Sequence, residues 1–222
     1  GSAAASEYHD MDWLTAHIGA GEDVQIKSLT NDQTILVLAG PKSRDLLAAV
    51  SDVDLSNAAF PFNSLQHFHI GHAPVFAQRL SYTGELGWEI YVSADMAAHA
   101  FETLHTAGQD MGLKLCGMHM MDSARIEKGF RHFGHDITAE DHVLEAGLGF
   151  AVKTDKPDFI GRDAVLRKKE TGLENRLLQF KLTDAEPLLY HNEPVVRDGE
   201  IVGYLSSGSY GHHLGGAMGL GY

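Results

Sequence analysis

The segment Arg79–Val92 constrains the fold more than any other part of this chain. Phe76–Tyr82 and Trp88–Val92 are rich in aromatic and branched residues, and Gly84 and Gly87 lie between the two runs. Two such runs joined by a short glycine-containing loop predict a β-hairpin. The chain must therefore contain at least one antiparallel strand pair, and the neighbouring segments have to pack around it.

Alternation along the second strand assigns its side chains to two faces. One face is expected to carry Trp88, Ile90 and Val92, and the other Glu89 and Tyr91. If the loop is symmetric, Tyr82 faces Glu89 across the strands. A glutamate can accept two parallel N–H bonds from an amino-pyrimidine edge, so this face suits a planar, nitrogen-rich ligand. The alternative is an ordinary hairpin with one solvated glutamate.

Composition limits the class of protein. The chain has 222 residues and a net charge of −13, which argues against broad contacts with nucleic acid or anionic membranes. Cys116 is the single cysteine, which rules out an internal disulfide and fits a reducing compartment. No apolar run approaches membrane-spanning length and no signal-peptide pattern opens the chain. We expect a cytoplasmic protein, with the mitochondrial matrix as the alternative.

Hydrophobic periodicity predicts a mixed α+β fold. Helices are expected at residues 3–18, 42–50, 94–107, 118–128 and 162–169. Strands are expected at 24–26, 34–38, 76–82, 88–92, 177–182, 194–197 and 201–206. The order of these elements suggests a split βαβ, ferredoxin-like unit. The polar break at residues 171–175 divides the chain into expected domains 1–172 and 173–222.

Five motifs follow one another along the chain: Leu38–Ser43, Tyr82–Ile90, Asp122–Gly129, Glu145–Lys153 and Asp158–Arg162. In this order they resemble the motifs of the aminomethyltransferase (glycine cleavage T-protein) superfamily. The resemblance covers nearly the whole chain. It implies a T-protein-like fold that binds tetrahydrofolate and ends in an antiparallel β-barrel-like domain. Compared with the family pattern, the chain is expected to be truncated at both ends.

The resemblance also implies the site residues. Asp10 matches the family's catalytic acid, and Asp12 is the competing candidate. The alternative for both is a helix-surface acid in a first turn, where the helix dipole favours negative charge. Glu89 would hold the pterin edge of the folate, and Tyr82 would pack beside it.

Two further folate-binding residues are implied on and after the helix expected at residues 118–128. Arg125 matches a family arginine, and its alternative is a structural ion pair with Glu127 or Asp122. Phe130 matches a position near the folate, and its alternative is a core aromatic at a helix end. A second family arginine is absent here, because the chain reads Met120-Met121-Asp122 at that place.

The segment Arg125–Ile137 resembles the dimethylglycine and sarcosine dehydrogenases, whose C-terminal halves are T-protein-like. This implies a folate domain that captures the iminium one-carbon unit from an N-methyl amine as methylenetetrahydrofolate. The partner would be an upstream flavin domain carrying FAD. The alternatives are a glycine-cleavage aminomethyltransferase, which needs a lipoyl-carrier partner, and a non-catalytic folate-binding relative. No metal site is predicted, because His67, His69 and His72 have no acidic or cysteine partner nearby in sequence.

Overall fold

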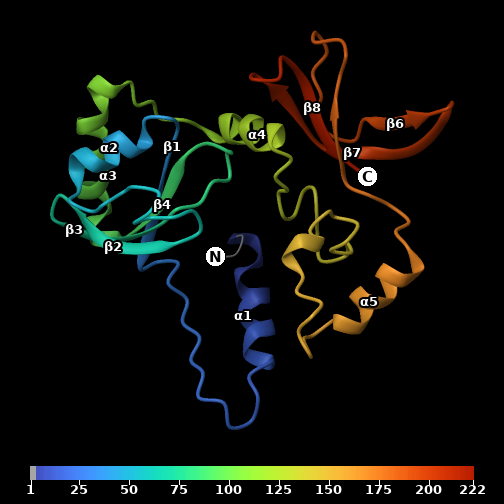
Figure 1. Ribbon diagram of the computed structural model, residues 1–222, viewed down its shortest axis with the longest axis horizontal. Helices are drawn as coiled ribbons and strands as arrows, with labels where there is room; N and C mark the ends of the chain where they lie inside the picture. Colours follow the sequence, from blue (N-terminus) through green and yellow to red (C-terminus); the bar gives the residue numbers. More distant parts are fainter. Residues whose placement is uncertain (1–3) are drawn as a thin grey trace. The chain divides into compact units, whose positions relative to one another are not determined.

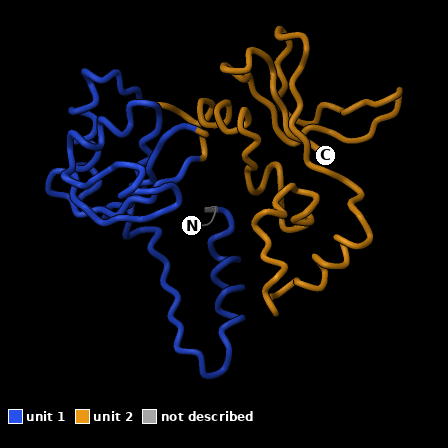
Figure 2. Tube along the Cα trace, in the orientation of Figure 1, with its two compact units in different colours: residues 1–81, 85–115 blue, residues 82–84, 116–222 orange. Residues whose placement is uncertain are grey.

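The structure is a computed structural model that describes residues 4–222. The chain divides into two compact units (Figure 2). Unit 1 comprises Gly1–Ser81 and Glu85–Leu115, and unit 2 comprises Tyr82–Gly84 and Cys116–Tyr222. The short segment Tyr82–Gly84 thus makes most of its contacts with unit 2, although the strands on either side of it belong to unit 1. The domain boundary expected after residue 172 stays a prediction.

Unit 1 is built on a four-stranded antiparallel sheet of order β1-β4-β3-β2 (Figure 1). Its strands are β1 (Gln33–Ala39), β2 (Leu65–Ile70), β3 (Ala73–Gln78) and β4 (Gly87–Ser93). The helix α2 (Ser43–Val50) connects β1 to β2, and α3 (Ala97–Gly108) follows β4 after the 3-10 turn η2 (Ala94–Met96), while η3 (Gln109–Met111) follows α3. The split βαβ prediction is wrong for these strands. Because β1 and β2 lie at opposite edges and run in opposite directions, α2 does not join a parallel pair.

The inner face of this sheet forms the core of unit 1. Trp88 and Ile90 are fully buried and Val92 is 1% exposed, which confirms that the three share one face of β4 and shows that this face is the buried one. Leu46 and Leu47 of α2 and Ala100 and Leu104 of α3 join the same apolar cluster. Both helices therefore cover the inner face, and the opposite face of the sheet is left to carry Glu89.

The predicted hairpin is present, but its register differs from the symmetric one. β3 pairs with β4 so that Gln78 faces Glu89, and β3 ends there. The chain then leaves the ladder, because the Arg79 N–H donates to the Ser64 carbonyl and the Arg79 carbonyl accepts from the Asn63 N–H. The expected pairing of Tyr82 with Glu89 is therefore wrong, and Tyr82 lies in the connecting loop.

The N-terminal part of unit 1 begins with a 3-10 turn, η1 (Ala4–Ser6), and continues as α1 (Glu7–Ala16). The helix predicted at 3–18 is thus confirmed over most of its length, and residue 3 lies outside the described residues. No residue of α1 is buried. The strand expected at 24–26 is absent, and that stretch runs irregularly toward β1.

Unit 2 contains α4 (Met118–Glu127), η4 (Gly149–Ala151) and α5 (Arg162–Thr171), followed by a second antiparallel sheet of order β5-β8-β7-β6. Its strands are β5 (Leu178–Lys181), β6 (Pro194–Arg197), β7 (Glu200–Gly211) and β8 (Gly216–Gly221). Asp198 and Gly199 form the tight turn between β6 and β7, with φ of 55° and 86°. Within the described residues this sheet is open, so the expected barrel is not closed in them.

Glycines set how closely β7 approaches its surroundings. A Cβ on Gly203 would collide with the Tyr222 carbonyl, and one on Gly208 would collide with the Leu189 backbone. β8 has every residue buried, although three of its six residues are glycines. None of the helices within residues 4–222 has the length and apolarity needed to cross a bilayer.

Candidate functional site

The outer face of the unit 1 sheet presents two cross-strand rows of side chains. The register places Ile35, Tyr91, Phe76 and His67 in one row, and Val37, Glu89, Gln78 and Leu65 in the next. Both β1 residues are open to solvent, Ile35 by 50% and Val37 by 68%. The face is therefore mostly apolar and aromatic, with one carboxylate near its middle.

Glu89 is held by the tyrosine two residues further along β4. The Tyr91 hydroxyl donates a hydrogen bond of 3.0 Å to Glu89 Oε2. The Tyr91 ring stacks on Phe76, its cross-strand partner, with ring centroids 4.5 Å apart and an interplanar angle of 9°. Burial, followed by the hydrogen bond to Glu89, raises the pKa of Tyr91, so its phenol stays a proton donor at neutral pH.

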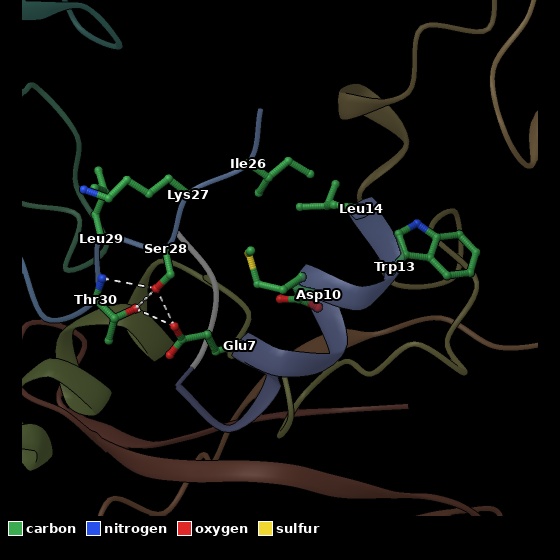
Figure 3. A pocket seen from close by; sticks show the side chains of 10 residues that line it. Glu7, Asp10, Trp13, Leu14, Ile26, Lys27, Ser28, Leu29 and Thr30 are labelled. Carbon is green, nitrogen blue, oxygen red and sulfur yellow. Dashed lines mark hydrogen bonds between the residues drawn. The ribbon is translucent and has the colours of Figure 1, made fainter. Parts of the chain in front are cut away.

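Asp10 lies on α1 and lines a cavity of about 530 Å³ (Figure 3). Its Oδ2 accepts a hydrogen bond of 3.2 Å from the Ser6 hydroxyl. The remaining lining residues come from α1 and from the segment 26–30; they are Glu7, Met11, Trp13, Leu14, Ile26, Lys27, Ser28, Leu29 and Thr30. Asp12, the competing candidate, is exposed and does not line this cavity.

Glu7 is a second carboxylate on the cavity wall, and no sequence pattern singled it out. Its Oε1 accepts hydrogen bonds from the Ser28 hydroxyl at 2.7 Å and the Thr30 hydroxyl at 2.8 Å (Figure 3). These two bonds lower the pKa of Glu7 and keep it ionised. They also join α1 to the segment that leads into β1.

Tyr82 and Phe130 come together in unit 2. Their rings stack with centroids 6.4 Å apart and an interplanar angle of 14°. The Tyr82 hydroxyl donates to the Arg131 carbonyl at 3.3 Å. Burial raises the pKa of Tyr82, and no negative charge on the ring oxygen is expected at neutral pH. The two aromatic residues predicted from sequence thus form one pair.

Arg125 supports this pair from a buried network. Its Nη1 donates to the Phe130 carbonyl at 3.2 Å and to Asp136 Oδ2 at 2.5 Å, and its Nε donates to Asp122 at 3.2 Å. Its side chain is only 2% exposed. The structural ion pair considered for Arg125 is therefore present, with Asp122 as foreseen and with Asp136 as an additional partner. Binding of folate by Arg125 itself stays a prediction.

Asp136 is the residue that sequence reasoning missed in this network. Its side chain is fully buried, and besides Arg125 it accepts bonds from the His132 N–H at 2.8 Å, the Ser206 hydroxyl at 2.7 Å and the Ser207 hydroxyl. Burial pushes the pKa of Asp136 upward, but these hydrogen bonds and the charge of Arg125 outweigh it and leave the pKa below its usual value.

The structure groups the predicted residues into three sets. Tyr82, Phe130 and Arg125 lie together in unit 2, whereas Glu89 lies on the unit 1 sheet face and Asp10 on the cavity wall of α1. Within residues 4–222, no group of three or more histidine, cysteine, aspartate or glutamate side chains is arranged to hold a metal ion.

Two family descriptions match the sequence. Residues 1–156 match the GCVT N-terminal domain, and residues 175–222 match the glycine cleavage T-protein C-terminal barrel domain. The crystal structure of glycine cleavage system aminomethyltransferase T from Bartonella henselae superimposes with a TM-score of 0.82 at 26% identity. That match covers 99% of this chain and 58% of the other.

Similar sequences fall into two groups of enzymes. The chain is 42% identical to 4-methylaminobutanoate oxidase (formaldehyde-forming) of Paenarthrobacter nicotinovorans, over 91% of this chain and 25% of that protein. It is 37% identical to mitochondrial dimethylglycine dehydrogenase of Mus musculus, over 100% of this chain and 26% of that protein. The aminomethyltransferase of Halothermothrix orenii is also 37% identical, over 96% of this chain and 58% of that protein.

The chain therefore spans about a quarter of the length of the first two relatives and 58% of the aminomethyltransferase. The N-terminal family match alone covers well over half of the chain, the C-terminal match follows it in order, and the superposition extends over 99% of the chain. These matches, with the α+β fold of two antiparallel sheets, place the chain in the GCV_T family of glycine cleavage T-protein domains.

Proposed function

We propose that this chain binds tetrahydrofolate and promotes transfer of a one-carbon unit to it, as the folate domain of a flavin-linked N-methyl amine dehydrogenase or oxidase. Tetrahydrofolate would accept the iminium carbon of an oxidised N-methyl amine and leave as methylenetetrahydrofolate, with release of the demethylated amine and a proton. The observation that carries the proposal is the Glu89 carboxylate on an aromatic sheet face, with one oxygen held by Tyr91.

The chemistry of Glu89 fits the pterin ring. Glu89 Oε1 accepts none of the hydrogen bonds that the described residues make, so it is available to an N–H donor of a ligand. A charged carboxylate makes stronger hydrogen bonds to an amino-pyrimidine edge than a neutral acceptor would. In unit 2, Tyr82, Phe130 and Arg125 are proposed as further folate-binding residues. Tyr82 and Phe130 stack on each other, and Arg125 donates a hydrogen bond to the Phe130 carbonyl.

Asp10 would handle protons and stabilise cationic iminium character during transfer. A carboxylate suits both tasks, because it can accept a proton and its negative charge stabilises the positive charge of the iminium. The apolar part of the Asp10 cavity, which includes Met11, Leu14 and Ile26, would limit access of water to the reacting carbon. Exclusion of water matters because a free iminium hydrolyses to formaldehyde.

The first test concerns binding. In the full-length protein, Glu89→Ala should weaken tetrahydrofolate binding by about 1.5–3 kcal/mol, the size of a lost hydrogen bond to a charged group. Isothermal calorimetry under anaerobic conditions measures the change. An unchanged affinity would remove Glu89 from the site.

The second test concerns chemistry. Asp10→Asn keeps the size of the side chain but removes its charge and its proton-accepting role, so methylenetetrahydrofolate formation should fall by about a hundred- to ten-thousand-fold. Amine oxidation should continue, with formaldehyde released in place of methylenetetrahydrofolate. Asp12→Asn, on the same helix but outside the cavity, is the matched control. If only the Asp12 change abolishes transfer, Asp12 is the acid.

A glycine-cleavage aminomethyltransferase is the second candidate. It is favoured by the superposition at a TM-score of 0.82 and by the 37% identity to a curated aminomethyltransferase. The resemblance of Arg125–Ile137 to the dehydrogenases favours the first candidate. Supplying the full-length protein with an N-methyl amine in one assay and an aminomethylated lipoyl carrier in another separates the two, because each candidate forms methylenetetrahydrofolate from only one of them.

A further inference from the structure

We propose that Tyr91 is a positioning residue for Glu89, holding its carboxylate so that one oxygen is fixed and the other faces the ligand. The inference rests on the proposed folate-binding role of Glu89. Its basis is the Tyr91 hydroxyl, which donates to Glu89 Oε2 at 3.0 Å. Residues two apart on a strand lie on the same face, so this bond needs no distortion of β4.

The Tyr91 ring is itself fixed in place. It lies parallel to the Phe76 ring at a centroid distance of 4.5 Å, and Phe76 is its partner in the β3–β4 ladder. Both rings are partly buried on a sheet whose other face is the packed core. A phenol anchored at its ring has little freedom to move its oxygen, so the hydrogen bond restricts the Glu89 side chain as well.

Among residues 4–222, no group other than Tyr91 forms a hydrogen bond with the Glu89 side chain. Its neighbours across the strands are Val37, which is 68% exposed and has no polar side-chain atoms, and Gln78, which donates no hydrogen bond to it. Without Tyr91, the flexible glutamate side chain would sample several rotamers in solvent. Binding would then have to order it, and ordering a flexible side chain lowers affinity.

A double-mutant cycle tests this role. The variants are Tyr91→Phe, Glu89→Ala and the double variant, each in the full-length protein, and the readout is the Kd for tetrahydrofolate by calorimetry. Tyr91→Phe keeps the ring stack and removes only the hydroxyl. We expect it to raise Kd by about 3- to 10-fold in the wild-type background, the range expected for one net hydrogen bond. In the Glu89→Ala background it should leave Kd unchanged.

The outcomes separate this inference from the proposed function. If Glu89→Ala leaves Kd unchanged, both are overturned. If Glu89→Ala weakens binding and Tyr91→Phe does not, only the positioning role is overturned. An equal effect of Tyr91→Phe on Kd in both backgrounds would mean that the hydroxyl acts independently of Glu89. That result would also overturn the positioning role.

The matched control is Tyr190→Phe, a tyrosine that is 67% exposed in unit 2 and should not alter Kd. Thermal unfolding of each variant checks that the fold is retained. If the Tyr91 hydroxyl had only a structural role, Tyr91→Phe would lower Tm without any coupling to Glu89 in the Kd values. The double-mutant cycle would detect this missing coupling.

Discussion

Replacing Asp136 tests the buried network of unit 2 most directly. Asp136→Ala removes a fully buried carboxylate that accepts hydrogen bonds from Arg125, His132, Ser206 and Ser207. The Arg125 guanidinium would keep a single carboxylate partner, Asp122, in a site that is 2% exposed. A buried charge that loses its partner is costly, because neither water nor a second protein group replaces the lost interaction.

The magnitude follows from what each donor does after the change. Ser206 has a second acceptor, because its hydroxyl also lies 3.1 Å from the Leu220 carbonyl. The His132 N–H has no second acceptor of this kind within residues 4–222. At Arg125, Asp122 remains but replaces only a small part of the lost charge pairing. Breaking a buried ion pair costs about 3–5 kcal/mol, and we expect the lower end of that range because Asp122 remains. Asp136→Asn keeps one acceptor oxygen and should cost about 1.5–3 kcal/mol.

Urea unfolding followed by circular dichroism measures both variants. Asp155→Ala and Asp155→Asn are the matched controls, because Asp155 is exposed in the same unit and should shift stability by less than about 0.5 kcal/mol. A cost below about 1 kcal/mol for Asp136→Ala, with an unchanged m-value, would refute the argument that this pair holds the unit together.

The same carboxylate predicts a pH dependence. Because the pKa of folded Asp136 lies below its unfolded value, its contribution to stability is present above an unfolded pKa of about 3.9. It is lost as the pH falls through the lower, folded pKa. Wild-type protein should therefore lose stability in this acid range more steeply than Asp136→Asn, which has no carboxyl group to protonate.

Two further predictions concern contacts inside unit 2. Gly84→Ala should destabilise the fold by about 1–2 kcal/mol, because Gly84 has a φ of 78° and an added Cβ would collide with the Lys128 side chain. Gly117→Ala is the control, because Gly117 has a negative φ and open space around it. The urea midpoints of the two variants measure the difference. Glu127→Gln should speed hydrogen exchange of the His213 backbone amide, because the charged Glu127 carboxylate accepts hydrogen bonds from both the backbone N–H and the ring Nδ1–H of His213. An unchanged exchange rate would contradict this.

Strand alternation was a sound guide to the faces of β4 but not to its register with β3. The burial of Trp88, Ile90 and Val92 follows from a period of two residues, which is local information. The register depends on where β3 ends, and that is decided by bonds between Arg79 and residues 63–64. Those bonds leave no mark in the hairpin sequence, so the pairing assigned to Tyr82 was wrong.

Long-range partners also limited what could be predicted of the candidate site. Tyr82 and Phe130 were each named from the family resemblance as folate contacts, but nothing in the sequence indicated that their rings stack on each other. The role of Asp136 depends on Ser206 and Ser207, which are 70 and 71 residues away in sequence. β7 runs on to Gly211, beyond the strand expected at 201–206, because its pairing with β8 overrides the weak strand propensity of the glycines and serines there.

The glycines of β7 and β8 have a consequence for how this chain tolerates variation. At Gly203 and Gly208, the space of a side chain is occupied by backbone atoms of Tyr222 and Leu189, and backbone cannot move aside as a side chain would. Even alanine should be excluded there, while exposed Ile201, 72% accessible and two residues from Gly203, should accept polar replacements. A saturation mutagenesis map of β7 would therefore show its most intolerant positions at residues with no side chain, remote from Glu89 and Asp10 in sequence.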